Sequence, residues 1–376
     1  MVAERVAERR QGARPVSFFA VTLPGLGKLL REEIAAHPAL EPGGDPGFDG
    51  RADLVFFRIR RGAGFLLDDL RLADDVFAVI SEAGGGPPDR VAASLITRTG
   101  LERALSMRAR FGRHLSPSMS FRVIARVVDE SRFKRTELRG AVEQTISASR
   151  PRWHGTDPAD LEVWVLEHRR AQFVCGLRLS DRRMRQHGEG RASERHGALR
   201  PVLAAAMVRL AGAEPGRLID PCCGSGTIVR EAKAAGWDAR GSDIDDEAVS
   251  IARTNVPGAV IERADAVSLP HPDGGFDAVV TNLPFGKQFQ VDTDPVGWVS
   301  DVLREAARVT RPGGRVIVLL PPPIRENAIG LVLASSHPLR LLGVPTRIWV
   351  YDRDESPVAR EPSAFTSSSP PSRTSP

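Results

Sequence analysis

The sequence predicts an α/β protein whose carboxy-terminal part holds a mostly parallel, seven-stranded sheet, preceded by smaller α+β units. Two observations predict this class. From residue 198 onward, helical stretches alternate with short apolar strands at the interval of βαβ units, whereas residues 16–185 form shorter groups of strands and helices. The 376 residues are 41% hydrophobic, which is enough for two or three domains of ordinary size.

The first α+β unit is expected at residues 16–85, after a flexible, charged leader at residues 1–15. It begins with an apolar strand in "VSFFAVT", turns at a Pro-Gly pair and continues into a helix whose leucines recur at helical spacing. "ADLVFFRIR" is typical of a returning strand, and residues 64–84 have strand or helix character. The following "GGGPPDR", residues 84–90, is expected to be a linker.

A second α+β unit is expected at residues 86–185. Its predicted elements are helices at 94–112 and 134–150, a strand at 119–129 and two strands within 161–180. The last two strands should be joined by a tight polar turn at 167–170. Residues 181–197 are rich in arginine and have no apolar period, so a linker is expected at 186–200.

The carboxy-terminal domain is expected at residues 201–352. Its predicted strands are 217–221, 238–244, 259–265, 276–282 and 314–320, with 339–344 and 347–353 as a closing hairpin. The Ser- and Pro-rich residues 353–376 are expected to form a disordered tail.

Positive charge is concentrated in one part of the chain. Residues 90–200 contain 23 basic and 12 acidic residues, whereas residues 201–376 contain 18 basic and 21 acidic ones. A net charge of +11 in the first region suits a polyanionic partner such as a nucleic acid. The alternative is that surface arginines are scattered there without a common role.

The cysteine content indicates neither a disulfide framework nor a zinc site. The three cysteines are Cys175, Cys222 and Cys223, and none of them forms a CxxC pair. The chain has no apolar run near the roughly 20 residues that cross a bilayer. We therefore expect a cytoplasmic, soluble protein without a metal or a membrane partner.

A glycine-rich turn follows the first predicted strand of the carboxy-terminal domain. "LIDPCCGSGTI", residues 218–228, is an apolar strand that ends at Asp220 and turns through Gly224-Ser225-Gly226 into a helix. Such a turn lets a ligand approach the backbone closely. By itself the pattern fits a dinucleotide site, a nucleoside site or a tight connection, and Val229 in place of a third glycine makes phosphate binding less favoured.

Two carboxylates follow the next two predicted strands. Asp243 ends the second strand, where it could accept hydrogen bonds from both hydroxyls of a ribose. Asp265 ends the third strand, where it could accept one from an adenine amino group. Asp246 and Glu247 are instead expected in the first turn of a helix, where acidic residues suit the helix dipole. Together with the glycine turn, this arrangement indicates a cofactor that contains a nucleoside.

The fourth predicted strand ends in Asn282-Leu283-Pro284-Phe285-Gly286. The proline biases the residue before it to an extended backbone, so the Asn282 side-chain carbonyl and the Leu283 main-chain carbonyl could face one point. Two acceptors at one point suit an exocyclic amino group, on whose ring Phe285 could stack. The alternative is an ordinary Pro-Gly turn after a strand.

The stretches "DPCCGSGTI", "GSDID", "RADA" and "TNLPFGKQ" resemble, in order and spacing, motifs I to IV of class I S-adenosylmethionine-dependent N-methyltransferases with a Rossmann-like domain. Upstream, "TLPGLGKLLREEI" resembles their N-terminal ferredoxin-like segment. "FRVIARVVDESRFKRTELRGAVEQTI" and "DLEVWVLEHRRAQFVCGLRLS" resemble a THUMP RNA-binding domain. The resemblance covers roughly residues 16–352.

The resemblance implies that S-adenosylmethionine is the cofactor. Its contacts would come from His196, Leu199, Asp220, Pro221, Cys222, Gly224, Ser225, Gly226, Thr227, Asp243, Ile244, Asp265, Ala266 and Asn282. The amino group of the substrate would be bound by Asn282, Leu283, Pro284 and Phe285.

The Asn-Leu-Pro-Phe-Gly form is similar to that of THUMP enzymes that make N2-methylguanosine at position 6 of tRNA, whereas relatives that act on guanosine 10 carry Asp-Pro-Pro-Tyr. We expect a monomer, and the resemblance implies that its THUMP and N-terminal domains grip the acceptor stem and CCA end of tRNA while its Rossmann-like domain receives a flipped guanine. It does not assign a phosphate contact to any single arginine of the connector, which holds Arg182, Arg183, Arg185, Arg191 and Arg195.

The sequence leaves other functions open. The same chemistry could act on a guanine of 23S ribosomal RNA, for which related enzymes usually carry Asn-Pro-Pro-Tyr. DNA adenine or a protein glutamine could be the acceptor, although the basic amino-terminal region favours RNA. A non-catalytic RNA-binding protein is disfavoured by Asn282 and the complete glycine turn, and Val229 makes a dehydrogenase the least favoured reading.

Overall fold

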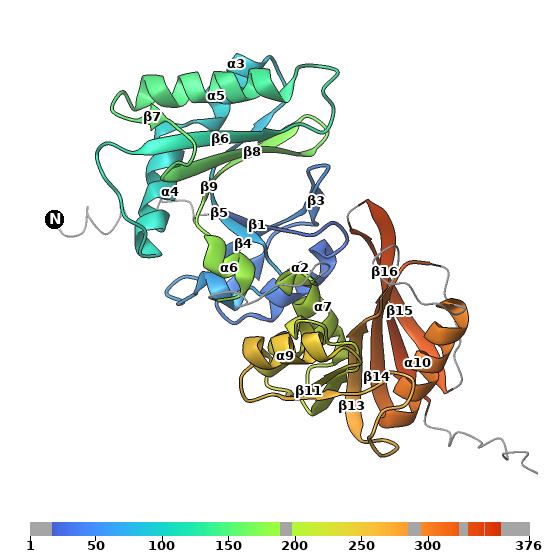
Figure 1. The fold of residues 1–376 in the computed structure, drawn as a ribbon. Coiled ribbons are helices and arrows are strands. Elements are labelled where there is room, and N and C mark those ends of the chain that lie inside the picture. Colours follow the sequence, from blue (N-terminus) through green and yellow to red (C-terminus); the bar gives the residue numbers. More distant parts are fainter. Residues whose placement is uncertain (1–16, 189–197, 285–294, 323–329, 342, 355–376) are drawn as a thin grey trace, which may run out of the picture.

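Two β-sheets, joined through the short helix α6 and the helix α7, make up the computed structural model (Figure 1). The structure describes residues 17–188, 198–284, 295–322, 330–341 and 343–354. The expected leader, most of the expected tail, and the predicted site residues His196 and Phe285 lie outside these ranges.

The first sheet and its helices cover the two predicted α+β units. Their elements are β1 (Ser17–Thr22), α2 (Gly27–Ala36), β2 (Leu40–Pro42), β3 (Gly47–Phe48), β4 (Asp53–Ile59), η1 (Leu67–Asp69), β5 (Asp75–Gly84), α3 (Pro88–Leu95), α4 (Arg98–Arg110), β6 (Ser120–Arg126), α5 (Arg135–Ser149), β7 (His154–Gly155), β8 (Leu161–Arg169), β9 (Gln172–Arg178) and α6 (Arg182–Gln186).

These strands form one continuous sheet in the order β2-β4-β1-β5-β9-β8-β6-β7, with β3 paired to β4. Strand β5 joins its two parts, because residues 75–78 pair with β1 and residues 77–84 pair with β9. The expected boundary between residues 85 and 86 falls immediately after this shared strand and stays a prediction.

The first sheet is buried on both faces. Helices α2 to α5 cover one face, and a separate apolar cluster that includes Phe19, Phe77 and Trp164 lies on the other. The rings of Phe19 and Phe77 stack with their centroids 4.6 Å apart. The loop before β4 reaches β6, where Arg126 Nη1 lies 2.7 Å from Asp49 Oδ2. This ion pair lies beside the second cluster, because the Arg126 guanidinium is also 4.7 Å from the Trp164 ring centroid.

Three local predictions for this part are wrong. Residues 88–90 are not linker but the first turn of α3, which starts at a proline because the first helical turn needs no N–H donor there. Residues 182–186 of the arginine-rich connector form α6, in which Met184 is buried. The turn after β8 lies at residues 170–171 rather than at 167–170, with Ala171 at φ 57°.

Glu167 explains the displaced turn. It belongs to β8 and is fully buried, so it cannot be a polar turn residue. Its carboxylate accepts hydrogen bonds from the main-chain N–H of Val128 (2.9 Å) and of Ala171 (2.8 Å), and from Arg132 Nη2 (2.8 Å). Glu167 lies in a polar stretch of the sequence but is a buried hydrogen-bond acceptor. Its contact with Ala171 fixes the turn that follows β8.

The second sheet contains the elements that the sequence predicts for the carboxy-terminal domain. They are α7 (Pro201–Ala211), β10 (Arg217–Asp220), α8 (Thr227–Ala234), β11 (Asp238–Asp243), α9 (Asp246–Asn255), β12 (Val260–Arg263), β13 (Phe276–Asn282), α10 (Pro295–Val309), β14 (Thr310–Leu320), β15 (Leu331–Leu341) and β16 (Val344–Arg353). The closing hairpin is longer than predicted, because β15 begins at residue 331 rather than 339.

The seven strands run in the order β12-β11-β10-β13-β14-β16-β15. The first five are parallel, and β16 and β15 are antiparallel to their neighbours, which confirms the mostly parallel seven-stranded sheet. One face carries α7, α8 and α9, and the other face packs against α10. Since β10 to β13 are parallel, their carboxyl ends lie along one edge, where open α/β sheets bind ligands.

No helix within the described ranges combines the length and the apolar composition that a membrane span requires.

Candidate active site

The turn between β10 and α8 uses its two glycines for different purposes. Both have positive φ, 51° at Gly224 and 81° at Gly226. A Cβ atom on Gly226 would lie 2.9 Å from Cγ2 of Val256, so this position has no room for a side chain. A Cβ atom on Gly224 would meet no described atom within 4 Å. Gly226 therefore permits packing against α9, and Gly224 leaves open space where a ligand can approach.

Neighbouring elements hold this turn in place. The main-chain N–H of Cys223 donates to the carbonyl of Ser242 (2.9 Å), and that of Gly224 donates to Oδ2 of Asp243 (2.9 Å). From the end of α9, Asn255 Nδ2 donates to the carbonyl of Ser225 (2.9 Å). The sequence did not identify Asn255, since its only signal is a polar residue at the end of a helical pattern.

Asp243 lies beside the turn, as the strand order requires. Its Oδ1 accepts a hydrogen bond from the N–H of Asp245 at 3.1 Å, in addition to the bond from Gly224. A carboxylate has about four acceptor positions, so capacity remains for hydroxyl donors. The next residue, Ile244, is 60% exposed and offers an apolar surface at the same edge of the sheet.

Asp265 follows β12 by two residues and is exposed. Its Oδ1 accepts a hydrogen bond from the N–H of Val267 (3.1 Å), which fixes the side chain against its own turn. Ala266 is buried in the core beneath it. Asp265 is therefore a hydrogen-bond acceptor of fixed orientation. It is separated from the glycine turn by β11, which lies between β12 and β10.

Asp220 is buried, with 1% of its surface exposed, at the end of β10. Burial raises the pKa of its carboxyl to about 7, in spite of the hydrogen bond from the Cys222 N–H, and the nearby charge of Asp243 acts in the same direction. A cationic group placed beside Asp220 would stabilise its ionised form.

The other polar residues of the turn are less available to a ligand. Ser225 and Thr227 are both buried, and their hydroxyl oxygens lie 3.5 Å apart. Pro221 is also buried. Burial raises the pKa of the Cys222 thiol well above its ordinary value, so this thiol stays neutral and is a poor nucleophile.

The end of β13 presents an acceptor that lacks a donor. Asn282 Oδ1 is buried and has no hydrogen-bond partner among the residues that the structure describes. Leu283 turns a fully buried side chain into the core below, and Pro284 is half-buried. Buried polar atoms are nearly always paired in native proteins, so Asn282 Oδ1 is suited to a ligand's N–H group.

The structure thus brings Asp220, Gly224, Asp243 and Asn282 to the carboxyl ends of three adjacent strands, β11, β10 and β13. Asp265 follows the neighbouring strand. Leu199 is half-buried and packs against the core just ahead of α7. His196 and Phe285 fall outside the described residues, and the direction of the Leu283 carbonyl stays a prediction.

A glycine turn after the first strand, carboxylates after the second and third, and an amide after the fourth define a class I methyltransferase. Comparison with known proteins agrees, since the family model described as "RMKL-like, methyltransferase domain" matches residues 189–324. The chain is 32% identical over 351 residues to the tRNA (guanine(6)-N2)-methyltransferase of Thermus thermophilus, a match that covers 89% of this chain and 98% of the relative. The protein belongs to the family of that enzyme.

Two further comparisons extend this result. TrmN from Thermus thermophilus has a crystal structure that matches with a TM-score of 0.68 and 27% identity, over 90% of this chain and 99% of that one. A "possible methylase" from Clostridium difficile 630 matches with a TM-score of 0.66 at 16% identity, over 92% and 100% of the two chains, and shows the fold alone. The U6 snRNA (guanine-N(2))-methyltransferase THUMPD2 of Bos taurus is 33% identical over 163 residues, 41% of this chain and 31% of the relative.

The protein is thus an S-adenosylmethionine-dependent methyltransferase, and the described residues fit this cofactor. The open space at Gly224 and the unpartnered Oδ1 of Asn282 lie at the same sheet edge as the Asp243 carboxylate. The described residues contain no group of three or more His, Cys, Asp or Glu side chains that could hold a metal ion.

Proposed function

We propose that the protein transfers the methyl group of S-adenosylmethionine to the exocyclic N2 of a guanosine in tRNA, at position 6 of the acceptor stem. The observation that carries the proposal is the buried, unpartnered Oδ1 of Asn282, next to the glycine turn in the sheet. A guanine amino group supplies the N–H donor that this oxygen lacks. The choice of tRNA and of position 6 rests on the likeness to the Thermus enzyme of that name.

In this proposal four parts of the cofactor have a matching residue: the ribose hydroxyls, the adenine ring, the adenine amino group and the ammonium. Asp243 accepts hydrogen bonds from the ribose hydroxyls, and the exposed Ile244 lies against the adenine ring. Asp265 accepts one from the adenine amino group. The ionised Asp220 binds the ammonium of the methionine part, and Gly224 lets the ligand approach the backbone.

The bound cofactor supplies an electrophilic methyl group carried on a sulfonium. The protein's part is to align the guanine amino group, whose lone pair is delocalised into the ring and attacks poorly without alignment. Asn282 Oδ1 and the Leu283 carbonyl accept hydrogen bonds from its two N–H groups and so aim the nitrogen lone pair at the methyl carbon. Once methylated, the amino nitrogen would release one proton to water.

We further propose that residues 86–185 are a THUMP domain that holds the CCA end. A surface pocket there is lined by Arg150, Arg152 and Trp153, and the Arg150 guanidinium lies 5.7 Å from the Trp153 ring centroid. Trp153 is only 9% exposed, so the pocket offers its two guanidinium groups for phosphate contacts with an unpaired strand rather than a ring for stacking. The proposed domains are 16–85, 86–185, 186–200 as linker and 201–352, in a cytoplasmic monomer.

The connector arginines differ in their freedom to bind phosphate. Arg185 is held by Asp75, with Nε and Nη2 at 3.0 and 2.7 Å from Oδ2. Arg183 also has a partner within the protein. Arg182 is exposed, which makes it the better candidate, and Arg191 and Arg195 lie outside the described residues.

The test is incubation of the protein with radiolabelled S-adenosylmethionine and unmodified tRNA or ribosomal RNA, followed by nucleoside analysis and mapping of the product. N2-methylguanosine at position 6 of tRNA is the expected result. Label in ribosomal RNA instead of tRNA would show that the proposed substrate is wrong. No label in either RNA would contradict the proposed RNA methyltransferase function. Asn282→Asp, which keeps an acceptor, should retain more activity than Asn282→Ala.

A further inference from the structure

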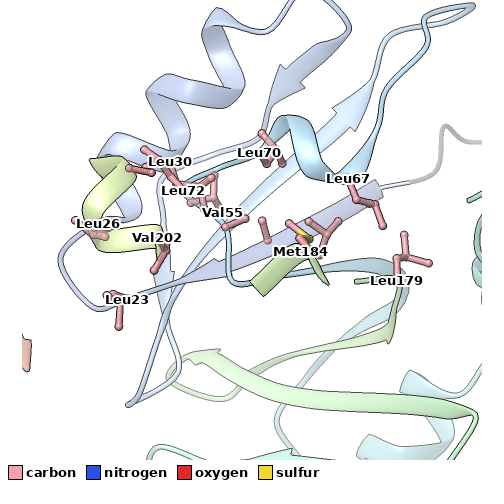
Figure 2. Close-up of a cluster of buried hydrophobic side chains, with 14 of the residues drawn as sticks. Leu23, Leu26, Leu30, Val55, Leu67, Leu70, Leu72, Leu179, Met184 and Val202 are labelled. Atoms are coloured by element: carbon pink, nitrogen blue, oxygen red, sulfur yellow. The ribbon is translucent and has the colours of Figure 1, made fainter. Parts of the chain in front are cut away.

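A buried apolar junction connects the amino-terminal sheet with the methyltransferase domain. Val202, in the first turn of α7, belongs to the same cluster as Leu26 just before α2, Leu30 of α2, Leu72 and Met184 (Figure 2). None of these five side chains is more than 3% exposed. Moving the two parts relative to each other would expose this apolar surface to water, so the cluster favours one arrangement.

An ionic cluster lies at the same junction, centred on Glu231 of α8. Arg71 donates to Glu231 Oε2 from Nη2 (2.6 Å) and Nε (3.1 Å), and Nδ1 of His187 lies 2.9 Å from the same oxygen. Burial opposes ionisation of Glu231, but His187 and Arg71 outweigh it and hold the pKa of the carboxyl below its ordinary value. The N–H of Arg71 also donates to Glu33 of α2 at 3.1 Å.

The neighbouring residues of the same loop make further contacts of this kind. Asp74 accepts a hydrogen bond from Arg200, just ahead of α7, at 2.5 Å. Asp75 is buried and binds Arg185 of α6 at 2.7 Å. The short segment 71–75 therefore binds α8, the start of α7 and α6 at once.

His187 is held in a strained backbone conformation at this junction. Its φ of 52° is in the left-handed region, which few residues other than glycine adopt without cost. Its side chain is 3% exposed and is directed at Glu231. His187 is the C-cap of α6, and this conformation ends the helix while the N–H donates to the carbonyls of Arg183 and Met184 and the ring reaches Glu231.

The cluster acts on the helix that begins at the cofactor turn. Glu231 lies one helical turn after Thr227, the first residue of α8. A force that holds Glu231 against Arg71 therefore fixes the active site relative to the amino-terminal sheet. That sheet carries the pocket at Trp153, where the CCA end is proposed to bind.

We propose that Arg71, Glu231 and His187 form a specificity-determining clamp, which sets the distance and angle between the RNA-binding half and Asn282 and so selects the guanosine that is methylated. This inference rests on the proposed tRNA methyltransferase function. Glu231 is a positioning residue in this role, because its carboxylate contacts Arg71 and His187 rather than the residues of the proposed active site.

The test compares Arg71→Met and Glu231→Gln with the wild type on two transcripts, one with a native acceptor stem and one with the stem lengthened by one base pair. The readouts are the mapped position of the methyl group, the ratio of turnover on the two stems, and the separate dissociation constants for S-adenosylhomocysteine and tRNA. A loss of fold alone would not move the methyl group to a different guanosine.

A matched control breaks an ion pair inside the methyltransferase domain. Arg308 has 33% of its side chain exposed and binds Glu305, and Arg71 is similarly exposed at 31%. Arg308→Met should leave the stem-length ratio unchanged. If both junction variants fail to fold, Asp74→Asn removes a contact with the half-exposed Arg200 and tests the same ratio in a milder variant.

The clamp predicts that turnover on the native stem falls by about 10²-fold, since a misplacement of about 1 Å can cost this much. Both dissociation constants should stay near the wild-type values, and the ratio between the stems should move toward one. If a folded variant methylates the same position with the same ratio between the stems, the clamp proposal is wrong. Activity of the wild-type protein would still support the proposed function in that case. Wild-type protein that methylates neither transcript would instead overturn the proposed function itself.

Discussion

Alanine at Gly226 should destabilise the methyltransferase domain more than alanine at Gly224, although the two lie in one turn and both have positive φ. At Gly226 the new Cβ atom would lie 2.9 Å from Val256 Cγ2 and 3.3 Å from Ala252 Cβ. At Gly224 it would meet no described atom within 4 Å. The two substitutions therefore share the backbone strain and differ in packing.

The magnitudes follow from these two terms. A left-handed conformation costs a residue with a Cβ atom roughly 1–2 kcal/mol, which applies to both variants. Overpacking a core costs about 1–3 kcal/mol more, which applies only to Gly226→Ala. The free energy of unfolding should fall by roughly 1–2 kcal/mol in Gly224→Ala and by about 2–5 kcal/mol in Gly226→Ala.

Cofactor binding should show a different pattern. A methyl group on Gly224 points into the space proposed for S-adenosylmethionine, so affinity should fall by about ten- to a hundredfold, which corresponds to about 1.4–2.8 kcal/mol. Gly226→Ala should retain much of its affinity wherever it remains folded, because its methyl group points toward α9.

Urea unfolding followed by circular dichroism, and calorimetric titration with S-adenosylhomocysteine, measure the two quantities. The difference between two variants of one turn is independent of contributions from the rest of the chain. Equal unfolding free energies for the two variants would refute the packing argument. Unchanged affinity in Gly224→Ala would refute the placement of the cofactor.

Three other predictions concern the same site. Asn282→Ala should abolish methyl transfer while tRNA affinity in a filter-binding assay stays near the wild-type value, and wild-type turnover in this variant would remove Asn282 from the mechanism. Asp220, with a pKa of about 7, should be ionised more completely as the pH rises, so affinity for S-adenosylhomocysteine should increase from pH 6 to pH 8 and this increase should disappear in Asp220→Asn. Without the cofactor, the folding stability should change in the opposite direction with pH. A carboxyl group whose pKa is higher in the folded than in the unfolded state stabilises the fold at low pH, and this contribution is lost as the pH rises from the unfolded-state pKa through about 7. Asn255→Leu should leave the Ser225 carbonyl unpaired at a cost of about 1–3 kcal/mol, which should raise KM for the cofactor more than it lowers kcat; a change confined to kcat would contradict a role in shaping the turn.

Much of the second sheet could be predicted because its signals are local. Apolar runs mark β10 and β13, and the polar residue that ends each run marks the edge where the site lies; β11 has no such run and is expected only from the βαβ interval. Parallel pairing then places Asp243 and Asn282 on the two sides of β10 without any knowledge of side-chain contacts. The Glu167 turn was misplaced because charge in a sequence does not reveal burial, which depends on partners far along the chain.

The sequence by itself determined the fold class of the methyltransferase domain, the glycine turn and the place of Asp220, Asp243, Asp265 and Asn282 at the ends of successive predicted strands. Strand and turn propensity and hydrophobic period act over a few residues and can be read directly. Only the tertiary structure decided that β5 joins both amino-terminal units in one sheet, that Asn255 holds the glycine turn and that Glu231 meets Arg71 across 160 residues. These contacts form only when surfaces far apart in the sequence pack together. A single polar residue does not indicate its distant partner in the sequence, and the two must pair only because folding buries them.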